Sequence, residues 1–282
     1  MTRRRGILYV TGALLIVGPP ALWIVSSIPS ATLIPKADVA RSASAANQTD
    51  DLAAIAQRDP MVLVGRGRAW YDANVHEYRC VLIKQERLGD TLSPVQEVEL
   101  RFRAAPRAVY MLWKTNADQA KRAMYLGDDR DYVDKNGEAL ARVEPAGAIA
   151  RLFVKDLYLP LHGSEARKAS RRTLDEAGFG ATFDLLEAYN AVAAKEGVLD
   201  IRYGGTGRVD GRPTYVIVRD LPYKDSSGPY PDARMVLHLD QEWLLPVAVY
   251  SYADHDENVL LGSYVFTQVE LNPTLGADAF QF

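Results

Sequence analysis

The sequence predicts an α+β domain built on one large curved antiparallel sheet, with helices packed against one of its faces. Two blocks, residues 78–126 and 198–270, have the pattern of successive long strands whose turns are marked by Gly, Pro, Asp and Asn. Two of these strands, 109–113 and 245–250, are apolar on both faces, whereas an antiparallel sheet with one hydrated face should alternate. Residues 145–197 instead carry apolar residues at helical spacing. We therefore expect helices from this segment to cover the second face.

The N-terminal segment has the pattern of a membrane signal. Residues 3–5 are arginines, and the uncharged, largely apolar stretch that follows them is longer than the roughly 20 residues needed to cross a hydrocarbon core. Arginines tend to stay on the cytoplasmic side, so the rest of the chain should face the periplasm. Gly18-Pro19-Pro20 leaves room for a shorter, cleaved signal, but no clear Ala-x-Ala site follows. We expect residues 1–35 to form an uncleaved anchor in the inner membrane, with a protein secreted to the periplasm as the alternative.

A linker and a helical start are expected before the first strand. Residues 36–51 are small and polar without an apolar period, which predicts a flexible tether. The folded domain should therefore occupy residues 52–282. Asp50 or Asp51 can cap a short first helix, and Pro60 separates it from a second helical piece.

The first block of strands contains a clear period of two. Val98, Leu100 and Phe102 alternate with charged residues, so their strand should have one buried and one hydrated face. Turn-forming residues separate this strand from its neighbours. The strands expected in this block are 78–87, 95–103, 109–113 and 122–126, followed by a short piece at 132–133.

The middle of the chain predicts helices, and the second block predicts further strands. Apolar stripes at 148–153 and 182–195 have helical spacing, whereas the charged stretch 163–172 indicates a solvated loop or helix surface. Residues 223–231 are too rich in turn formers to be a strand. The strands expected in the second block begin at Leu199 and include 214–219, 234–240, 245–252 and 259–270.

The composition excludes several classes of function. Acidic residues (36) outnumber basic ones (33), so the chain lacks the positive field that would bind nucleic acid. Cys80 is the only cysteine, which excludes an intramolecular disulfide and a cysteine-rich metal site. The four histidines are scattered and His255-Asp256-Glu257 has the pattern of a polar turn, so we expect no metal or other cofactor. No Gly-x-Ser-x-Gly nucleophile elbow occurs, and we do not expect an enzyme.

Two charged clusters are the remaining candidates for a polar site. Lys84 and Glu86 share one face of the first strand, and Gln85 and Arg87 share the other. Hydrated polar faces are the default for a half-buried sheet, so we expect cross-strand ion pairs on the convex surface. Arg171-Arg172 lies in a short charged run that we expect to be solvated rather than to bind an anion.

The order of elements and several motifs resemble an uncharacterised bacterial family, domain of unknown function 1571, which lies within the lipoprotein-carrier (LolA-like) superfamily. The resemblance spans about residues 60–282. It implies a strongly curved half barrel with helices packed into its concave face, and a surface that binds acyl chains or apolar protein segments. The motifs that carry the resemblance are Tyr78, Lys84-Gln85-Glu86-Arg87, Val98 to Phe102, Pro106, Val109-Tyr110, Trp113, Leu237-His238-Leu239-Asp240, Leu245-Pro246-Val247, Tyr250, Tyr264 and Leu271-Asn272.

The resemblance and the doubly apolar strands together predict a binding protein. We expect a non-catalytic, membrane-anchored protein, facing the periplasm, that binds a lipid, a lipoprotein or another apolar ligand in the half barrel. The alternative is an envelope sensor or interaction module whose interior is fully packed and which binds a protein partner. The wall residues expected to contact a ligand are Leu100, Phe102, Tyr110, Leu112, Tyr125, Leu237, Val247, Val249, Tyr264 and Phe266.

Overall fold

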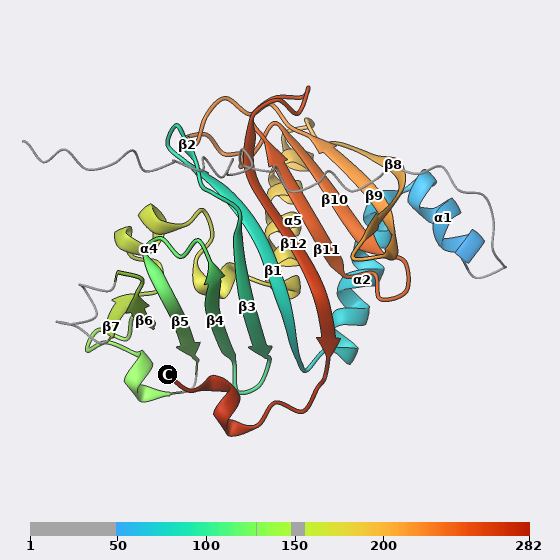
Figure 1. Ribbon diagram of the computed structural model, residues 1–282. Coiled ribbons are helices and arrows are strands. Elements are labelled where there is room, and N and C mark those ends of the chain that lie inside the picture. Colours follow the sequence, from blue (N-terminus) through green and yellow to red (C-terminus); the bar gives the residue numbers. More distant parts are fainter. Residues whose placement is uncertain (1–48, 128, 148–155) are drawn as a thin grey trace, which may run out of the picture. The chain divides into compact units, whose positions relative to one another are not determined.

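One antiparallel sheet organises the part of the chain that the structure describes. The structure is a computed structural model, and it describes residues 49–127, 129–147 and 156–282. The strands follow the order β7-β6-β5-β4-β3-β1-β12-β11-β10-β9-β8, and β2 pairs with β1 outside this path (Figure 1). They are β1 (Glu77–Leu88), β2 (Thr91–Leu92), β3 (Gln96–Arg103), β4 (Ala108–Thr115), β5 (Ala120–Leu126), β6 (Leu140–Pro145), β7 (Leu157–Pro160), β8 (Asp200–Val209), β9 (Arg212–Asp220), β10 (Arg234–Asp240), β11 (Pro246–Tyr252) and β12 (Leu260–Leu271).

The centre of the sheet joins the two blocks of strands. β1 pairs with β3 on one side and with β12, the last strand of the chain, on the other. In the register with β12, Leu82 lies opposite Phe266 and Lys84 lies opposite Tyr264. Both pairings are antiparallel, so the predicted antiparallel sheet is confirmed, and its middle is built from residues of both blocks.

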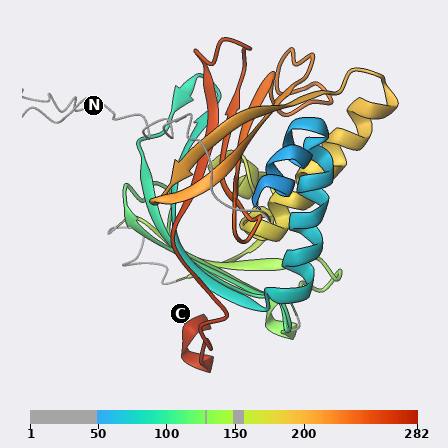
Figure 2. The same cartoon turned by 90° about the vertical axis from the view of Figure 1, so that its right-hand side faces the viewer.

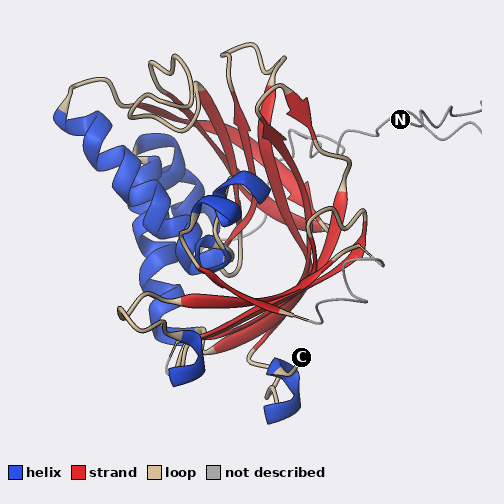
Figure 3. Ribbon diagram, turned by 90° about the vertical axis from the view of Figure 1, so that its left-hand side faces the viewer, coloured by secondary structure: helices blue, strands red, loops and turns tan. Residues whose placement is uncertain are grey.

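The longer helices lie on the concave side of the sheet, as Figures 2 and 3 show from opposite directions. Asp59 caps the second helix by accepting the backbone N–H of Met61 at 3.0 Å, and Pro60 occupies the first turn, where a missing N–H is tolerated. The predicted break at Pro60 is thereby confirmed. The helices are α1 (Thr49–Arg58), α2 (Pro60–Asn74), α4 (Ser164–Ala169) and α5 (Phe179–Lys195), and the short 3-10 helices are η1 (Arg130–Tyr132), η2 (Leu174–Glu176) and η3 (Ala277–Phe280).

The main hydrophobic core fills part of the space between these helices and the sheet. The ring of Phe179 on α5 lies 4.7 Å from that of Tyr78 on β1 and 4.8 Å from that of Phe266 on β12, measured between centroids. Leu63 of α2 and Phe183 of α5 are completely buried in the same cluster. Burial of one such side chain contributes about 1.5–3 kcal/mol. The apolar stripe of the predicted helix at 182–195 therefore does cover the sheet.

Strand β4 is covered on both faces, but not as expected. Val109 belongs to the main core, whereas Ala108 and Tyr110 pack with Phe280 in a separate cluster. Successive residues of a strand point to opposite faces, so η3 covers the second face of β4. Helix α5 of the segment 148–195 thus shares a core cluster with one face of β4, but it does not cover the other face, because β12 returns the end of the chain to the outer side of the sheet (Figure 1).

Other segments differ from the prediction or lie outside the described residues. β6 and β7 extend the sheet beyond the predicted fourth strand, and the piece expected at 132–133 is the end of η1 followed by an isolated bridge between Val133 and Ala139. The predicted anchor at 1–35, most of the linker and the stripe at 148–153 fall outside the described ranges. Within those ranges, none of the helices has the length and apolarity needed to span a membrane.

Candidate functional site

A cavity of about 530 Å³ lies between the concave face of the sheet and the helical segments. Leu185, Leu186 and Tyr189 of α5 line one side of it. The opposite wall, on strands β5 to β7, is formed by Ala120, Ala123, Ala141, Val143, Leu157 and Leu159. Alanine side chains leave space that larger residues would fill, so the small residues of β5 and β6 help to create this apolar part of the cavity.

A buried ion pair forms a polar wall of the cavity. Lys84 Nζ lies 2.8 Å from Glu86 Oε2, and the two side chains are only 9% and 4% exposed. Alternate residues of a strand point to the same face, so Lys84 and Glu86 lie on the same face as Cys80 and Leu82, which are buried in the main core. The expectation that Lys84 and Glu86 form exposed ion pairs on the convex surface is therefore wrong. They do share one face, as predicted, but it is the buried concave one.

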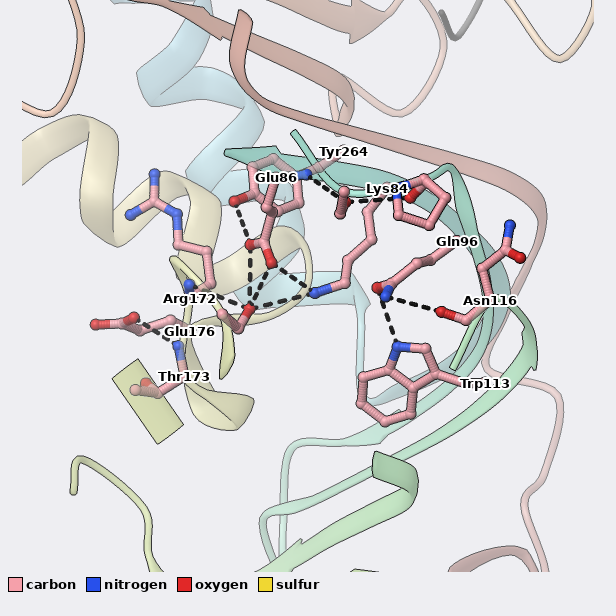
Figure 4. Close-up of polar contacts among 12 residues, drawn as sticks. Lys84, Glu86, Gln96, Trp113, Asn116, Arg172, Thr173, Glu176 and Tyr264 are labelled. Carbon is pink, nitrogen blue, oxygen red and sulfur yellow. Dashed lines mark hydrogen bonds and ion pairs between the residues drawn. The ribbon is translucent and has the colours of Figure 1, made fainter. Parts of the chain in front are cut away.

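Glu86 accepts hydrogen bonds from three side chains on different elements. Besides Lys84, Tyr264 Oη donates to Glu86 Oε1 at 2.7 Å, and Ser170 Oγ donates to Oε2 at 2.8 Å (Figure 4). Burial by itself would raise the pKa of Glu86, but the charge and hydrogen bond of Lys84 and the hydrogen bonds of Tyr264 and Ser170 lower that pKa below its ordinary value. A buried carboxylate without such partners would be strongly destabilising. The network therefore keeps Glu86 ionised inside the domain.

Gly262 gives the Tyr264 ring the room that it needs to reach Glu86. Gly262 lies directly opposite Glu86 in the register between β1 and β12. A β-carbon at position 262 would lie 3.2 Å from both Cε2 and Oη of Tyr264. That is closer than ordinary van der Waals contact, so a side chain at this position would push the ring away. The close approach explains a glycine in the interior of a strand.

The neighbouring wall residues are also fixed by hydrogen bonds. Trp113 Nε1 donates to Gln96 Oε1 at 3.1 Å, and Gln96 Nε2 donates to the backbone carbonyl of Asn116 at 3.1 Å (Figure 4). Lys84 Nζ lies 6.0 Å from the centre of the Trp113 ring. The indole and the amide are thus held in place beside the ion pair, and this part of the wall is preformed.

A second buried ion pair lines the cavity on the β9 side. Arg219 Nη2 donates to Asp232 Oδ1 at 2.9 Å, and both side chains are 2% exposed. Arg219 Nη1 also donates to Asn190 Oδ1 of α5 at 3.0 Å. The pair therefore ties β9 to α5 and to the loop that precedes β10. Arg219 Nε is buried without a hydrogen-bond partner in the described chain.

The polar wall offers the chemistry of binding rather than that of a nucleophile. Ser170 Oγ lies 3.2 Å from Lys84 Nζ, but Lys84 is the donor in this contact and the hydroxyl donates to Glu86. An activated serine needs a base that takes its proton, and a carboxylate whose pKa is lowered is a weak base. Among the described residues, no group of three or more His, Cys, Asp or Glu side chains is placed to hold a metal ion.

The structure places the ten predicted wall residues in three different environments. Those that line the cavity are Val249, Tyr264 and Phe266. Those buried in the main core, outside the cavity lining, are Leu100, Phe102, Leu237 and Val247. Those that belong to the cluster at the C-terminal segment, or pack against it, are Tyr110, Leu112 and Tyr125. Contact of any of them with a ligand stays a prediction.

Sequence reasoning missed the polar wall, although part of its signal was present in β1. The buried residues Cys80 and Leu82 continue, at a period of two, to Lys84 and Glu86. Extending that period would have placed both charges on the buried face. Ser170 had no such signal, because it lies in the irregular segment between α4 and η2, whose position depends on the whole fold.

Comparison with known families decides the relationship of this chain. The family model described as a protein of unknown function, DUF1571, matches residues 75–282. The chain belongs to this family. The resemblance found in the sequence motifs is thus confirmed for DUF1571. A comparison of this DUF1571 member with curated proteins gave no match.

Several solved structures are similar to this DUF1571 member at low identity. MucB is 18% identical, with 80% of this chain and 63% of MucB covered and a TM-score of 0.47. The lipoprotein LppX of Mycobacterium tuberculosis is 14% identical, with 77% and 98% covered and a TM-score of 0.39. A LolA superfamily protein of Nitrosomonas europaea is 8% identical, with 79% and 97% covered and a TM-score of 0.29. The chain spans less than two thirds of the length of MucB.

Proposed function

We propose that this DUF1571 member binds the acyl chain of a lipid or lipoprotein in its concave cavity, without catalysing a reaction, on the periplasmic side of the inner membrane. The observation that carries the proposal is the cavity itself, which has an apolar wall on β5 to β7 and opens a space inside an otherwise closely packed domain. Sites for small ligands typically enclose about 300–1,000 Å³, and 530 Å³ lies within that range.

The distribution of polar and apolar groups favours a ligand with a head and a tail. Lys84, Glu86 and Tyr264 come from β1 and β12 at the centre of the sheet, whereas Ala141 and Leu159 come from β6 and β7 near its edge. The walls thus change from charged to apolar along the sheet. A molecule with one polar end and one hydrocarbon end matches this change.

The cavity also bears on the alternative function. A sensor or interaction module whose interior is completely packed would leave no space on the concave face. The space bounded by Ala123, Ala141 and Leu185 favours the ligand-binding function over that alternative. A protein partner that delivers or receives the ligand is compatible with the same cavity.

Mass spectrometry of bound lipid tests the proposal. Full-length protein should be purified without detergent, in copolymer nanodiscs if it is membrane-bound, and its extract should be enriched in one acyl lipid, in about stoichiometric amount, over nanodiscs from the same membranes that lack the protein. Titration with saturated alkyl ligands of increasing length should then lower the Kd about fourfold for each added methylene, because one buried methylene contributes about 0.8 kcal/mol. The gain should stop when the chain fills the cavity. Protein that shows no such enrichment and takes up none of the alkyl series would overturn the proposal.

A further inference from the structure

We infer that the ligand of this cavity is an acid whose negatively charged head is bound by the Arg172 guanidinium. The inference rests on the proposed function and adds the chemical class of the head group, a carboxylate or phosphate on a hydrocarbon chain. It assigns a binding role to a residue that the sequence alone placed in a solvated surface run.

Among the residues that the structure describes, three cationic side chains line the cavity, and two of them are already neutralised. Lys84 is paired with Glu86, and Arg219 is paired with Asp232. The third cation, Arg172, is half-buried, and its guanidinium has no hydrogen bond or ion pair with any residue that the structure describes. Figure 4 shows this guanidinium beside the polar wall with no contact drawn to it. Of the described cations in the cavity wall, Arg172 is therefore the one that is left for a ligand.

The segment around Arg172 is held by its neighbours rather than by Arg172 itself. Ser170 donates to Glu86, and Arg171 Nη2 donates to the backbone carbonyl of Pro231 at 3.0 Å. On the other side, Thr173 N donates to Glu176 Oε2 at 2.9 Å. The backbone of Arg172 is thus fixed on both sides while its charged end is unengaged. Such an arrangement prepares a side chain for an external partner instead of an internal one.

The acidic residues of the lining do not neutralise Arg172. Each of these carboxylates already accepts a hydrogen bond from another group of the chain, and none pairs with Arg172. The carboxylates concerned are Glu86, Asp118, Glu165, Glu176 and Asp232. A guanidinium presents five N–H donors in a planar fork that fits a carboxylate or phosphate with two parallel bonds. A neutral alcohol or ester offers no charge to this fork, so the geometry favours an anion.

The test compares ligands that differ only in their head groups. Palmitate, hexadecyl phosphate and hexadecanol should compete with the fluorescent fatty acid cis-parinaric acid for full-length protein. We expect the wild type to bind one or both anions about tenfold more tightly than the alcohol, which is the effect of a hydrogen-bonded charge at a partly exposed site. The variant Arg172→Gln should lose that preference while its Kd for hexadecanol stays unchanged. The stronger of the two anions identifies the head group as carboxylate or phosphate.

A matched variant separates a specific contact from a general loss of positive charge. Arg167 is exposed on α4 and does not line the cavity, so Arg167→Gln should retain the full preference for anions. Thermal unfolding should show that Arg172→Gln is as stable as the wild type, since the guanidinium makes no hydrogen bond or ion pair with a residue that the structure describes. Equal binding of anions and alcohol by the wild type, or an unchanged preference in Arg172→Gln, would overturn this inference while the proposed function stands. No binding of any of the three ligands would overturn both.

Discussion

Two regions of the same concave face are filled in different ways. In the filled region, Leu63 of α2 and Phe183 of α5 are completely buried in one cluster with Ile217 and Leu237 of the sheet. In the open region, the sheet side toward β5 to β7 carries residues such as Ala123, and a cavity is present. Helix α5 contributes side chains to both regions. Two things therefore differ between the regions: the open one has small side chains on β5 and β6, and no residue of α2 lines it.

The largest effect on stability is expected for Glu86, in the polar wall of the open region. Glu86→Gln removes the charge that neutralises Lys84 but keeps nearly the same side-chain shape, with an NH2 group in place of one carboxylate oxygen. Removing one partner of a buried ion pair costs about 3–5 kcal/mol, and we expect a loss of that size in the free energy of unfolding. Urea unfolding followed by circular dichroism measures it.

A double variant serves as the control for this change. Lys84→Met combined with Glu86→Gln removes both charges and should recover most of the lost stability, because no unpaired buried charge remains. Equal destabilisation by the single and the double variant would show that Glu86 acts through its other hydrogen bonds, to Tyr264 and Ser170, and not through Lys84.

Acid should destabilise the domain first through His238, on the other face of the sheet, and only at a lower pH through Glu86 of the open region. His238 follows Leu237 on β10, so its side chain points to the opposite face, and burial lowers its pKa from 6.5 to about 4. Between these values the unfolded chain binds a proton and the folded chain does not, so stability falls by about 3 kcal/mol as the pH drops from 6.5 to 4. The pKa of Glu86 lies below its ordinary value of 4.5, so the stability that Glu86 contributes is lost only below pH 4.5.

Unfolding free energies measured from pH 7 to pH 3 separate the two contributions. His238→Gln keeps a group that can bond to Thr214, whose Oγ1 lies 3.0 Å from His238 Nδ1. It should flatten the stability profile between pH 6.5 and 4, whereas Glu86→Gln should flatten it only below pH 4.5. A profile that is unchanged above pH 4.5 in His238→Gln would contradict the assignment.

The smallest effect on stability is expected when an alanine is replaced by leucine in the open region, and the same replacement in the filled region is the comparison. Ala56 of α1 is completely buried in the main core, so Ala56→Leu should overpack it and cost about 1–3 kcal/mol. Ala123→Leu has the cavity to expand into and should change stability by less than about 1 kcal/mol. It should instead raise the Kd of an alkyl ligand by more than about tenfold, because the leucine occupies volume that the ligand would fill. Equal losses of thermal stability in Ala56→Leu and Ala123→Leu would contradict the division of the concave face into a filled and an open region.

Most of the sheet could be predicted because strand patterns and turn residues are local properties of the sequence. The alternation of Val98, Leu100 and Phe102 with charged residues reappears in β3 as alternating buried and more exposed positions. β7 could not be predicted in this way, because it is only 4 residues long and pairs with one neighbour at the edge of the sheet. The pairing of β1 with β12 has no local signal either, because it joins opposite ends of the domain.

The candidate site was harder to predict than the fold. Lys84 and Glu86 are charged, and charged residues on a strand normally face solvent. Their burial is stabilised by hydrogen bonds from Ser170 and Tyr264, which only the folded chain brings close. The cavity is equally invisible in the sequence, because Ala123 has the pattern of an ordinary core residue. A space appears only when the distance to the opposite helix is known. Polar walls and cavities are thus properties of the assembled fold.

Gly262 offers a means of recognising the same arrangement in other chains. It contributes no atom to the contact between Tyr264 and Glu86, so a survey of lining side chains would overlook it. Yet in a relative with a larger residue at this position the tyrosine ring would have to move by a few tenths of an ångström, which should weaken the contact even if both partners are retained. The combination of glycine, tyrosine and glutamate at positions 262, 264 and 86 can therefore serve as a diagnostic signature for sorting family members by their interior, before any of them is crystallised.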